Sequence, residues 1–257
     1  MALYALTVTI ANVSLPQMQG ALSATQDQIA LVVTFNIVAT AVATPMTGWL
    51  VARFGQRRLL LFSVAAFTMS TLACGLAGSL ETLVFFRVLQ GLSGAPLAPT
   101  SQAIVLASYP QSKHGTATAI FGMGVVIGPL IAPTIGGYLS EEYSWRWVFF
   151  MIVPFGIASL LGCFAFVADG VRTARIRLDW TGFLALSVAI ACFQLLLDRG
   201  ERNSWLESTE IVLEICAAAL CFYIFVVHTF TAKKPFLNPA LFLDRNFVLG
   251  MTLTLVF

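Results

Sequence analysis

Gly48–Arg58 reads GWLVARFGQRR and joins an apolar run that begins at Gln28 to another that begins at Leu59. The segment is too short to hold a domain. Glycine tolerates the backbone conformations that a tight turn needs, and lysine and arginine collect in the cytoplasmic loops of membrane proteins. This stretch therefore predicts two membrane helices that turn back at a cytoplasmic face.

The composition independently favours a membrane protein. Hydrophobic residues make up 58% of the chain and charged residues 10%, and the mean hydropathy is +0.88. A soluble domain carries roughly 25% charged residues. The net charge of +2 is too small to indicate a nucleic-acid partner. The lipid bilayer is therefore the predicted partner, and nucleic acid is not.

Long apolar segments follow one another along the chain with short polar or basic separators. A bilayer core needs about 20 mostly apolar helical residues. Segments of this kind lie at Ala2–Met18, Gln28–Val51, Leu59–Gly78, Thr82–Ser108, Thr116–Leu139, Trp147–Ala168, Trp180–Leu197, Ile211–Thr231 and Phe247–Phe257. We therefore predict an all-α integral membrane protein with eight crossings and the start of a ninth.

The basic residues predict the orientation, because they are unequally divided between alternate loops. One set of loops holds Arg53, Arg57, Arg58, Lys113, Arg172, Arg175, Arg177, Lys233, Lys234 and Arg245. The other set holds only Arg146, Arg199 and Arg202. The first set is predicted to be cytoplasmic, which places the amino terminus in the cytoplasm.

Both ends of the chain lie in apolar sequence. Met1 is followed at once by a membrane segment, and Phe257 ends within an apolar run. The start has neither the basic region nor the small-residue cleavage site of a signal peptide. We therefore expect the chain to be a fragment.

Residues that could carry catalysis are scarce. The only histidines are His114 and His228, and neither belongs to a metal-ligand cluster or a nucleophile–base pattern. An interfacial position is expected for both. No phosphate-binding glycine loop is present. The sequence predicts no catalytic residue, no metal site and no cofactor, so energy for any transport must come from elsewhere.

The basic turn resembles the loop between the second and third helices of the major facilitator superfamily, G-x-x-x-D-R-x-G-R-R. Five positions match, namely Gly48, Arg53, Gly55, Arg57 and Arg58, whereas Ala52 replaces the acid and Gln56 one basic residue. The arginines could bind carbonyl groups at helix C-termini, where the helix dipole is negative. The alternative is an ordinary basic loop.

In the fourth segment, Arg87–Gly94 reads RVLQGLSG and resembles the superfamily pattern R-x-x-Q-G at Arg87, Gln90 and Gly91. An arginine within a membrane keeps its proton and must find acceptors or water, so it is a functional candidate by default. It lies near the predicted outer end of its helix, and snorkelling to the interface is the alternative.

In the fifth segment, Gly128–Gly137 reads GPLIAPTIGG and resembles the antiporter motif G-P-x-x-G-G, with Ala132 in place of one glycine. Prolines bend a helix and glycines let a neighbour approach closely. The motif residues are Gly128, Pro129, Pro133, Gly136 and Gly137. The alternative is plain packing of small residues.

The first segment, Leu6–Pro16, reads LTVTIANVSLP and is similar to L-D-x-T-x-x-N-V-A-L-P of drug:proton antiporters, with matches that include Thr9 and Asn12. Thr7 stands where that family has a membrane carboxylate. Trp145–Gly156 resembles W-R-W-x-F-x-x-N-x-P-x-G. Because these resemblances agree in order and spacing, the chain is identified as a member of the 14-helix drug:proton antiporter branch.

That resemblance implies a division of the chain into three parts. A major facilitator six-helix bundle is expected at 1–168, two linking helices at 169–231, and a cytoplasmic loop with the start of the second bundle at 232–257. Such proteins carry substrate between two bundles, so a chain with one bundle is expected to be inactive alone.

The implied function is multidrug efflux of hydrophobic compounds by proton antiport across a bacterial inner membrane. The implied transport and coupling residues are Arg87, Gln90, Gly91, Asn12 and Thr9. The resemblance also implies two protein partners, a periplasmic adaptor and an outer-membrane channel. A superfamily carrier for a metabolite or sugar is the alternative, and a membrane-embedded enzyme is disfavoured because clustered His, Asp or Glu residues are missing.

Overall fold

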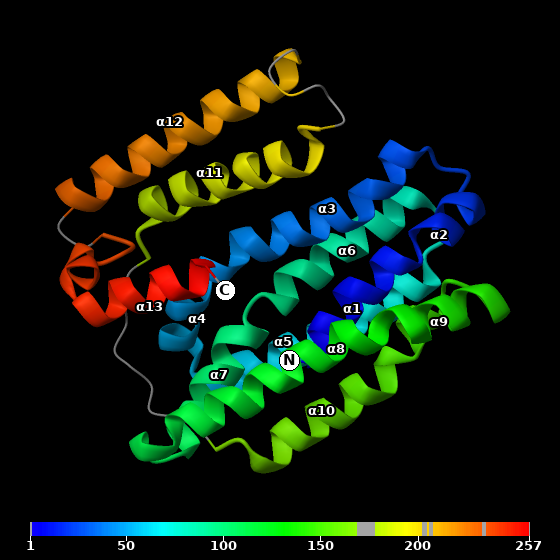
Figure 1. The fold of residues 1–257 in the computed structure, drawn as a ribbon, viewed down its shortest axis with the longest axis horizontal. Coiled ribbons are helices and arrows are strands. Elements are labelled where there is room, and N and C mark those ends of the chain that lie inside the picture. The colour runs from blue at the N-terminus through cyan, green and yellow to red at the C-terminus, as the bar shows by residue number, and fades with distance from the viewer. Residues whose placement is uncertain (1, 169–177, 202–204, 206–207, 233–234, 257) are drawn as a thin grey trace. The chain divides into compact units, whose positions relative to one another are not determined.

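The computed structural model describes residues 2–168, 178–201, 205, 208–232 and 235–256 (Figure 1). The chain divides into two compact units, Met1–Ile176 and Arg177–Phe257. Within the described residues every regular element is helical and no strand forms. The predicted all-α architecture is therefore confirmed.

The first unit contains the helices that correspond to the first six predicted crossings. Their bounds are α1 Ala2–Val13, α2 Leu15–Ala21, α3 Gln26–Ala43, η1 Thr44–Met46, α4 Thr47–Phe54, α5 Gln56–Leu76, α6 Leu80–Gly94, α7 Leu97–Ser108, η2 Gln111–Lys113, α8 His114–Glu142, α9 Trp147–Phe150 and α10 Ile152–Phe166.

Proline marks the breaks in three crossings whose patterns predict one continuous helix each. The first crossing breaks after Val13, with Pro16 in the first turn of α2. Pro45 lies in η1 between α3 and α4, and Pro96 precedes α7. Proline has no amide hydrogen to donate, so it fits the first turn of a new helix better than a helix interior.

Among the described residues, six helical stretches are long and apolar enough to cross a membrane, and α1 is a shorter apolar helix. The stretches are Gln26–Phe54, Gln56–Leu76, Gln111–Glu142, Trp147–Phe166, Trp180–Arg199 and Thr209–Thr231. Each lies on a predicted crossing. These stretches make the chain a multi-pass membrane protein.

Side-chain caps fix where two helices of the first unit begin. Thr25 accepts a hydrogen bond from the Gln28 amide while the Gln28 side chain accepts one from the Thr25 amide. Ser79 and Thr82 form the same reciprocal arrangement before α6. A capping box satisfies amides that have no acceptor within the helix. These two polar turns therefore define where α3 and α6 begin.

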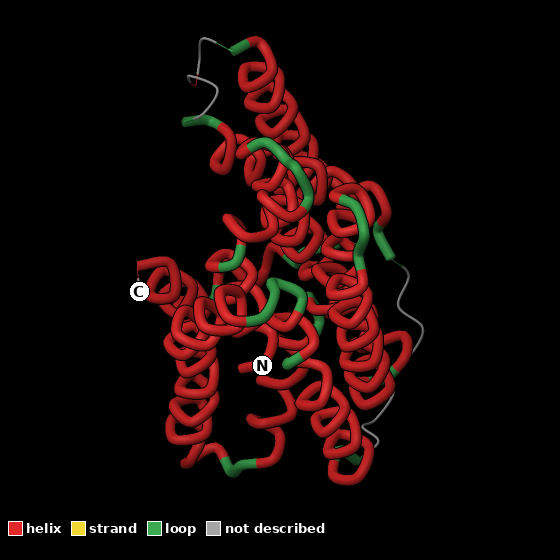
Figure 2. Tube along the Cα trace, turned by 90° about the vertical axis from the view of Figure 1, so that its right-hand side faces the viewer, coloured by secondary structure: helices red, strands yellow, loops and turns green. Residues whose placement is uncertain are grey.

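Long helices pack side by side in the first unit, with short loops between them (Figure 2). Helix α1 lies against α8, α3 against α6, and α5 against both α6 and α10. Large hydrophobic side chains including Phe62, Met69, Leu130 and Phe166 are exposed, whereas Arg87 is fully buried. Polar groups inside and apolar groups outside suit a protein surrounded by lipid.

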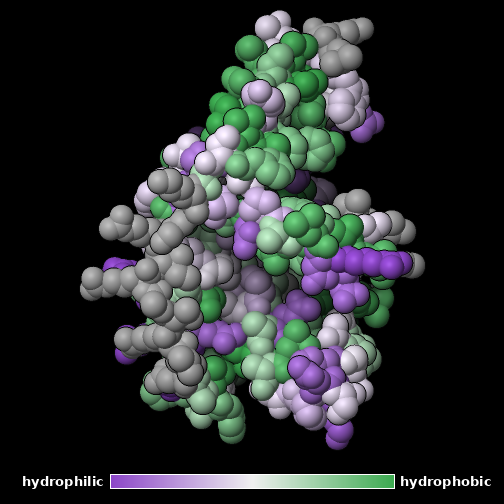
Figure 3. All heavy atoms as spheres, turned by 90° about the vertical axis from the view of Figure 1, so that its left-hand side faces the viewer, coloured by the Kyte–Doolittle hydropathy of each residue, from purple (hydrophilic) through white to green (hydrophobic). Residues whose placement is uncertain are grey.

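The second unit is a helical hairpin followed by a short arm. Its helices are α11 Trp180–Arg199, α12 Thr209–Thr231, η4 Pro239–Leu243 and α13 Arg245–Val256. Helices α11 and α12 pack along each other, and hydrophobic residues cover much of this hairpin at the top of Figure 3. Some of the basic residues used to predict the orientation lie outside the described residues, namely Arg172, Arg175, Arg177, Arg202, Lys233 and Lys234.

Candidate functional site

Arg87 lies on α6 with none of its surface exposed. Its Nε donates to the Val32 carbonyl at 3.1 Å, and its Nη1 donates to Gln90 Oε1 at 2.6 Å. A snorkelling arginine would extend its guanidinium to the interface. The structure therefore excludes that alternative and places the charge inside the helix bundle.

Three neighbouring polar side chains extend this contact into what we call the Arg87 network, which consists of Asn36, Thr71, Arg87 and Gln90. Gln90 Nε2 donates to the Thr71 hydroxyl at 2.7 Å. Asn36 Nδ2 donates to the Arg87 carbonyl at 2.8 Å and approaches Gln90 Oε1 at 3.5 Å. All four side chains are buried, and they join α3, α5 and α6.

The charge of Arg87 is held without a carboxylate. Within the described part of the chain no Asp or Glu forms an ion pair with it. The guanidinium instead lies 5.9 Å from the centroid of the Phe149 ring. Arg87 Nη2 and Asn36 Oδ1 have no hydrogen-bond partner among the described residues. Neutral groups thus stabilise a permanent charge, and the Nη2 donor of that charged group has no acceptor among the described residues.

Gly91 lets α3 and α6 approach each other beside the network. A Cβ atom at this position would collide with the Asn36 carbonyl oxygen and lie 3.0 Å from Ala39 Cβ. The Thr40 hydroxyl lies 2.8 Å from the Asn36 carbonyl of its own helix and, across the contact, 3.2 Å from the Gly91 carbonyl. Close packing of small residues is a common way for membrane helices to associate.

Two other predicted transport residues, on α1, do not hydrogen-bond to the network. The Thr9 hydroxyl donates to the Ala5 carbonyl of its own helix at 3.1 Å, and Asn12 is exposed. Thr7, which stands at the family's carboxylate position, is buried and donates to the Leu3 carbonyl at 2.6 Å. The structure therefore brings Arg87, Gln90 and Gly91 together and leaves Thr9 and Asn12 apart.

The basic turn places one arginine at a helix C-terminus. Arg57 Nη2 donates to the Phe164 carbonyl near the end of α10 at 2.9 Å, and its guanidinium lies 5.4 Å from the Phe164 ring centroid. Gln56 donates to the Thr100 carbonyl at 3.2 Å. The side chains of Arg53 and Arg58 are exposed. The carbonyl contact predicted for the turn arginines is thus present at Arg57.

The two motif glycines of the turn have different surroundings. Gly55 separates α4 from α5 with φ of 87°, the only positive φ at a glycine in the described chain. A Cβ atom at Gly48 would meet no other atom within 4 Å. Backbone conformation therefore requires glycine at position 55, and contact geometry does not require it at position 48.

Arg146 makes a similar contact at the other end of the same helices. Its Nη2 donates at 3.0 Å to the carbonyl of Ala77, the residue that follows α5, and its guanidinium lies 4.5 Å from the Trp145 ring centroid. Arg57 lies in the first turn of α5 and binds a carbonyl near the end of α10, whereas Arg146 precedes α9 and binds the carbonyl that follows α5. Sequence reasoning placed Arg146 among the loop charges and in the W-R-W motif, but it did not predict this carbonyl contact.

The antiporter motif divides between a helix seam and an outer face. A Cβ at Gly128 would lie 2.6 Å from the Ala2 carbonyl oxygen, and one at Gly136 would lie 2.6 Å from Ile10 Cγ1. The buried Ser14 and Ser140 hydroxyls continue this α1–α8 seam with a 2.8 Å hydrogen bond. Gly137 has no neighbour within 4 Å of a Cβ position. Pro129 is partly exposed and Pro133 is exposed. Helix α8 is continuous through both prolines.

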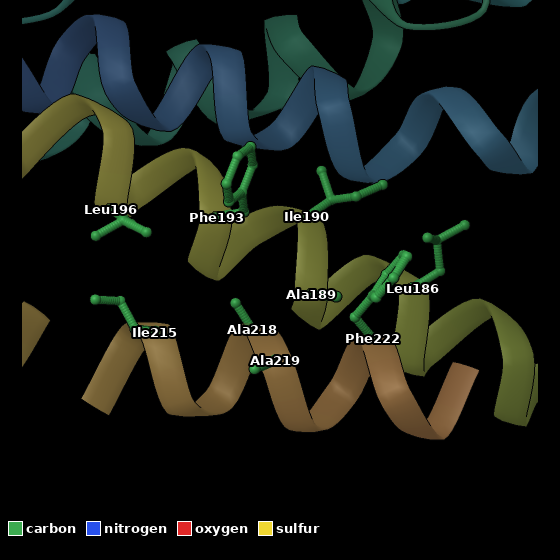
Figure 4. A pocket seen from close by; sticks show the side chains of 9 residues that line it. All are labelled: Leu186, Ala189, Ile190, Phe193, Leu196, Ile215, Ala218, Ala219 and Phe222. Carbon is green, nitrogen blue, oxygen red and sulfur yellow. The ribbon is translucent and has the colours of Figure 1, made fainter. Parts of the chain in front are cut away.

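An apolar groove of about 510 Å³ lies along the α11–α12 hairpin. Figure 4 labels its lining side chains, which come from both helices and are all apolar. Small-molecule sites usually add a few placed polar groups that fix the ligand's orientation. Because the groove lining has none, we assign the candidate site to the Arg87 network.

Sequence reasoning missed two members of this network, Asn36 and Thr71. Asn36 is an amide in a long apolar segment, and a polar residue within a membrane segment is itself a functional signal. Thr71 gave no such signal, because threonines are frequent in these helices. No group of three or more His, Cys, Asp or Glu residues in the described chain could hold a metal ion.

These features define a class, a polytopic helical membrane protein with a buried polar centre. The family model of the Major Facilitator Superfamily matches residues 1–257. The chain belongs to that superfamily, as its motifs predict.

Similar proteins include exporters from several bacteria. The chain is 39% identical over 243 residues to the multidrug export protein EmrB of Escherichia coli K12, covering 94% of this chain and 48% of that protein. It is 38% identical over 250 residues to the fatty acid resistance protein FarB of Neisseria gonorrhoeae, covering 97% and 49%. The chain therefore spans about half the length of these curated relatives.

Similar solved structures confirm the fold of this chain and, at their low sequence identity, nothing about its function. The peptide transporter POT in complex with sulfate matches with a TM-score of 0.64 at 16% identity, covering 91% of this chain and 52% of that one. An inward-facing bacterial homologue of the lysosomal transporter Spinster matches with a TM-score of 0.56 at 19% identity, covering 92% and 60%.

Proposed function

We propose that this chain supplies half of a secondary transporter that exports hydrophobic compounds from the cytoplasm in exchange for protons. Superfamily membership and relatives named as multidrug export proteins support the export assignment. The observation that carries a transport role for this half is the Arg87 network, a permanent charge on α6 that is buried against α3 and α5, two helices in stretches long and apolar enough to cross a membrane. Such groups are rare in membranes and usually functional.

The proposed mechanism is alternating access between two halves. Transporters of this superfamily bind substrate between two bundles and rock them to expose the site to each side in turn. The chain spans about half of its relatives, so the 257-residue chain is proposed to be inactive without an opposing bundle. The division into 1–168, 169–231 and 232–257 is part of this proposal.

Arg87 is proposed to act as a fixed charge and not as the proton carrier, because a guanidinium does not release its proton in proteins. Gln90 and Gly91 position it, and Thr9 and Asn12 are proposed to contribute polar groups on α1. Thr7 and Ala52 cannot titrate. The titrating group for proton antiport is therefore assigned to a position other than these two.

The seam between α1 and α8 is proposed to keep ions from leaking. Gly128 and Gly136 bring α8 within contact distance of α1, and a tightly packed seam leaves no space for water. Gly48, Gly55 and the arginines Arg53, Arg57 and Arg58 are proposed to form the cytoplasmic turn around which the helices move, with Arg57 as its anchor.

The proposed location is a bacterial inner membrane with the amino terminus in the cytoplasm. The unequal distribution of basic residues supports this orientation. A periplasmic adaptor and an outer-membrane channel are proposed as partners, and the loops on the less basic side would be their docking surface. Transport, and not an enzymatic reaction, is the proposed activity.

An efflux assay in cells that express the complete gene tests this function. We expect export of a hydrophobic dye to stop when an uncoupler collapses the proton gradient. Arg87→Gln should lose most of the export while the protein still inserts, because the fixed charge is gone. Lys113→Gln removes an exposed charge that lies outside the proposed turn and is the matched control. Export that continues unchanged after the gradient collapses would contradict proton coupling.

A further inference from the structure

Asp179 directly precedes α11 and caps it. Its Oδ1 accepts a hydrogen bond from the Gly182 amide at 3.1 Å. An aspartate at this position satisfies an amide that has no acceptor within the helix. The same carboxylate, however, has two further donors from distant parts of the chain.

One of these donors is His228, close to the end of α12. Its Nε2 lies 2.9 Å from Asp179 Oδ1 and 3.0 Å from Oδ2. The Asp179 side chain is 13% exposed and the His228 side chain 27%. His228 thus ties the end of α12 to the start of α11, a contact that its place in the sequence does not reveal, and its interfacial position stays a prediction.

The other donor is the amide of Phe236, which lies beyond α12. It donates to Asp179 Oδ2 at 3.0 Å. The Phe236 ring lies 5.7 Å from the Phe183 ring on α11, and a Cβ at Gly182 would lie 3.0 Å from Phe236 Cβ. One carboxylate thus joins three segments, namely the start of α11, the end of α12 and the chain after it.

The chain after Phe236 leads directly to α13 through local contacts. Asn238 caps η4 by accepting from the Ala240 amide at 3.1 Å. Asp244 accepts from the Asn246 amide at 2.8 Å before α13, and Phe242 packs edge-on against Phe247. These contacts connect η4, which begins three residues after Phe236, to the first turn of α13.

This arm has little packing of its own. Helix η4 has no buried residue, and Leu241 and Leu243 are exposed. Segments with few buried contacts open at low free energy unless something else ties them down. The contacts of Phe236 with Asp179 and Phe183 tie the arm to α11.

The carboxylate is charged in this arrangement. Burial raises the pKa of Asp179, but hydrogen bonds from the Gly182 amide, His228 and the Phe236 amide outweigh burial and hold the pKa below its ordinary value. An ionised carboxylate only accepts hydrogen bonds. His228 Nε2 therefore carries a hydrogen, in either charge state of the ring.

We propose that Asp179 is a latch that holds the arm 235–243 against the α11–α12 hairpin, so that release of Phe236 frees α13 from the hairpin. The latch is a positioning device built into the second unit. It rests on contacts within that unit and not on the proposed transport activity.

Hydrogen–deuterium exchange of the 257-residue chain in lipid nanodiscs tests the latch. The key variant is Asp179→Ser, because serine still caps α11 but is too short to reach both Phe236 and His228. We expect the Phe236 amide to exchange about tenfold faster or more, as loss of a hydrogen bond to a charged group implies. Amides of η4 and the first turn of α13 should follow, while Gly182 and the interiors of α11 and α12 stay protected.

Glu210→Gln is the matched control at the other end of the hairpin. It removes the negative charge from another carboxylate, which accepts from Arg199 at 2.7 Å, and it makes no contact with the arm. Exchange in the arm should not change. Two results would overturn the latch: unchanged Phe236 exchange in Asp179→Ser, or a uniform loss of protection across α11 and α12, which would make Asp179 a helix cap and nothing more.

Discussion

The two units hold their charges in opposite ways. In the first unit Arg87 is fully buried, and its acceptors are a backbone carbonyl and a neutral amide. In the second unit each end of the hairpin pairs opposite charges or a charge with an imidazole, Arg199 with Glu210 and Asp179 with His228. The buried charge of the first unit is thus held by fixed neutral dipoles, whereas the charged groups at the two ends of the hairpin have ionisable partners.

Reversing the buried charge should break the first unit most severely. In Arg87→Glu a carboxylate would face the Val32 carbonyl and Gln90 Oε1, which are both acceptors. We expect a loss of about 3–5 kcal/mol in the free energy of unfolding, as for removal of one member of a buried charge network. Denaturant unfolding of the detergent-solubilised chain, followed by circular dichroism, measures this loss.

The control for that prediction is Arg58→Glu, which reverses an exposed arginine. Its stability should change by less than about 1 kcal/mol. Equal effects of the two reversals would show that burial of Arg87 does not matter, and the contrast between the units would fail.

The α1–α8 seam should be the next most sensitive feature. Gly128→Val would place a branched side chain against the Ala2 carbonyl and the Leu6 backbone, which cannot move without shifting the helix. We expect a loss of about 1–3 kcal/mol in unfolding free energy. Gly137→Val, in the same motif but without a neighbour within 4 Å, should cost much less, and the same unfolding assay compares them.

A result in which Gly137→Val costs as much as Gly128→Val would show that helix propensity, and not contact across the seam, sets the glycine requirement. The second unit offers a contrast, because no glycine in the described chain lines the apolar groove between its two long helices. Glycine contacts should therefore matter more across the α1–α8 seam than between α11 and α12.

The smallest expected effect is the pH response of the arm. The pKa of Asp179 is lowered from 3.8 in the folded chain, so its contribution is complete above the ordinary value and disappears as the pH falls through the lower folded value. Protection of the Phe236 amide, corrected for intrinsic exchange, should stay level between about pH 8 and pH 5 and decline only at pH values below 3.8.

Amides of α6 around Arg87 provide the comparison in that experiment. No carboxylate contacts Arg87 in the described chain, so protection there should not follow the Asp179 titration. Loss of Phe236 protection near neutral pH would mean that another group controls the arm.

The positions of the helices along the chain were largely predictable from the sequence, but the contacts between helices were not. Apolar segments such as Trp180–Leu197 and Ile211–Thr231 predict helices that the structure begins and ends within two residues of those bounds. The contact of Arg87 with Val32 joins residues 55 positions apart, and that of His228 with Asp179 joins residues 49 apart. Periodicity describes one helix at a time and carries no information on which helix lies opposite.

The candidate site shows the same limit. The pattern R-x-x-Q-G predicts that Arg87, Gln90 and Gly91 belong together, because residues three and four apart share a helix face. It does not reveal that Asn36 and Thr71 complete the network from α3 and α5. Nor does it show that Asn12 is exposed.

The sequence by itself determined that this chain is an all-helical membrane protein with a basic turn at Gly48–Arg58, because apolar length and local charge are properties of single segments. Only the tertiary structure decided which motif residues make contacts. It selected Gly55 by its backbone angle, Gly128 and Gly136 by the approach of α1, and Arg57 by the end of α10. These choices depend on the space and acceptors that a neighbouring helix provides.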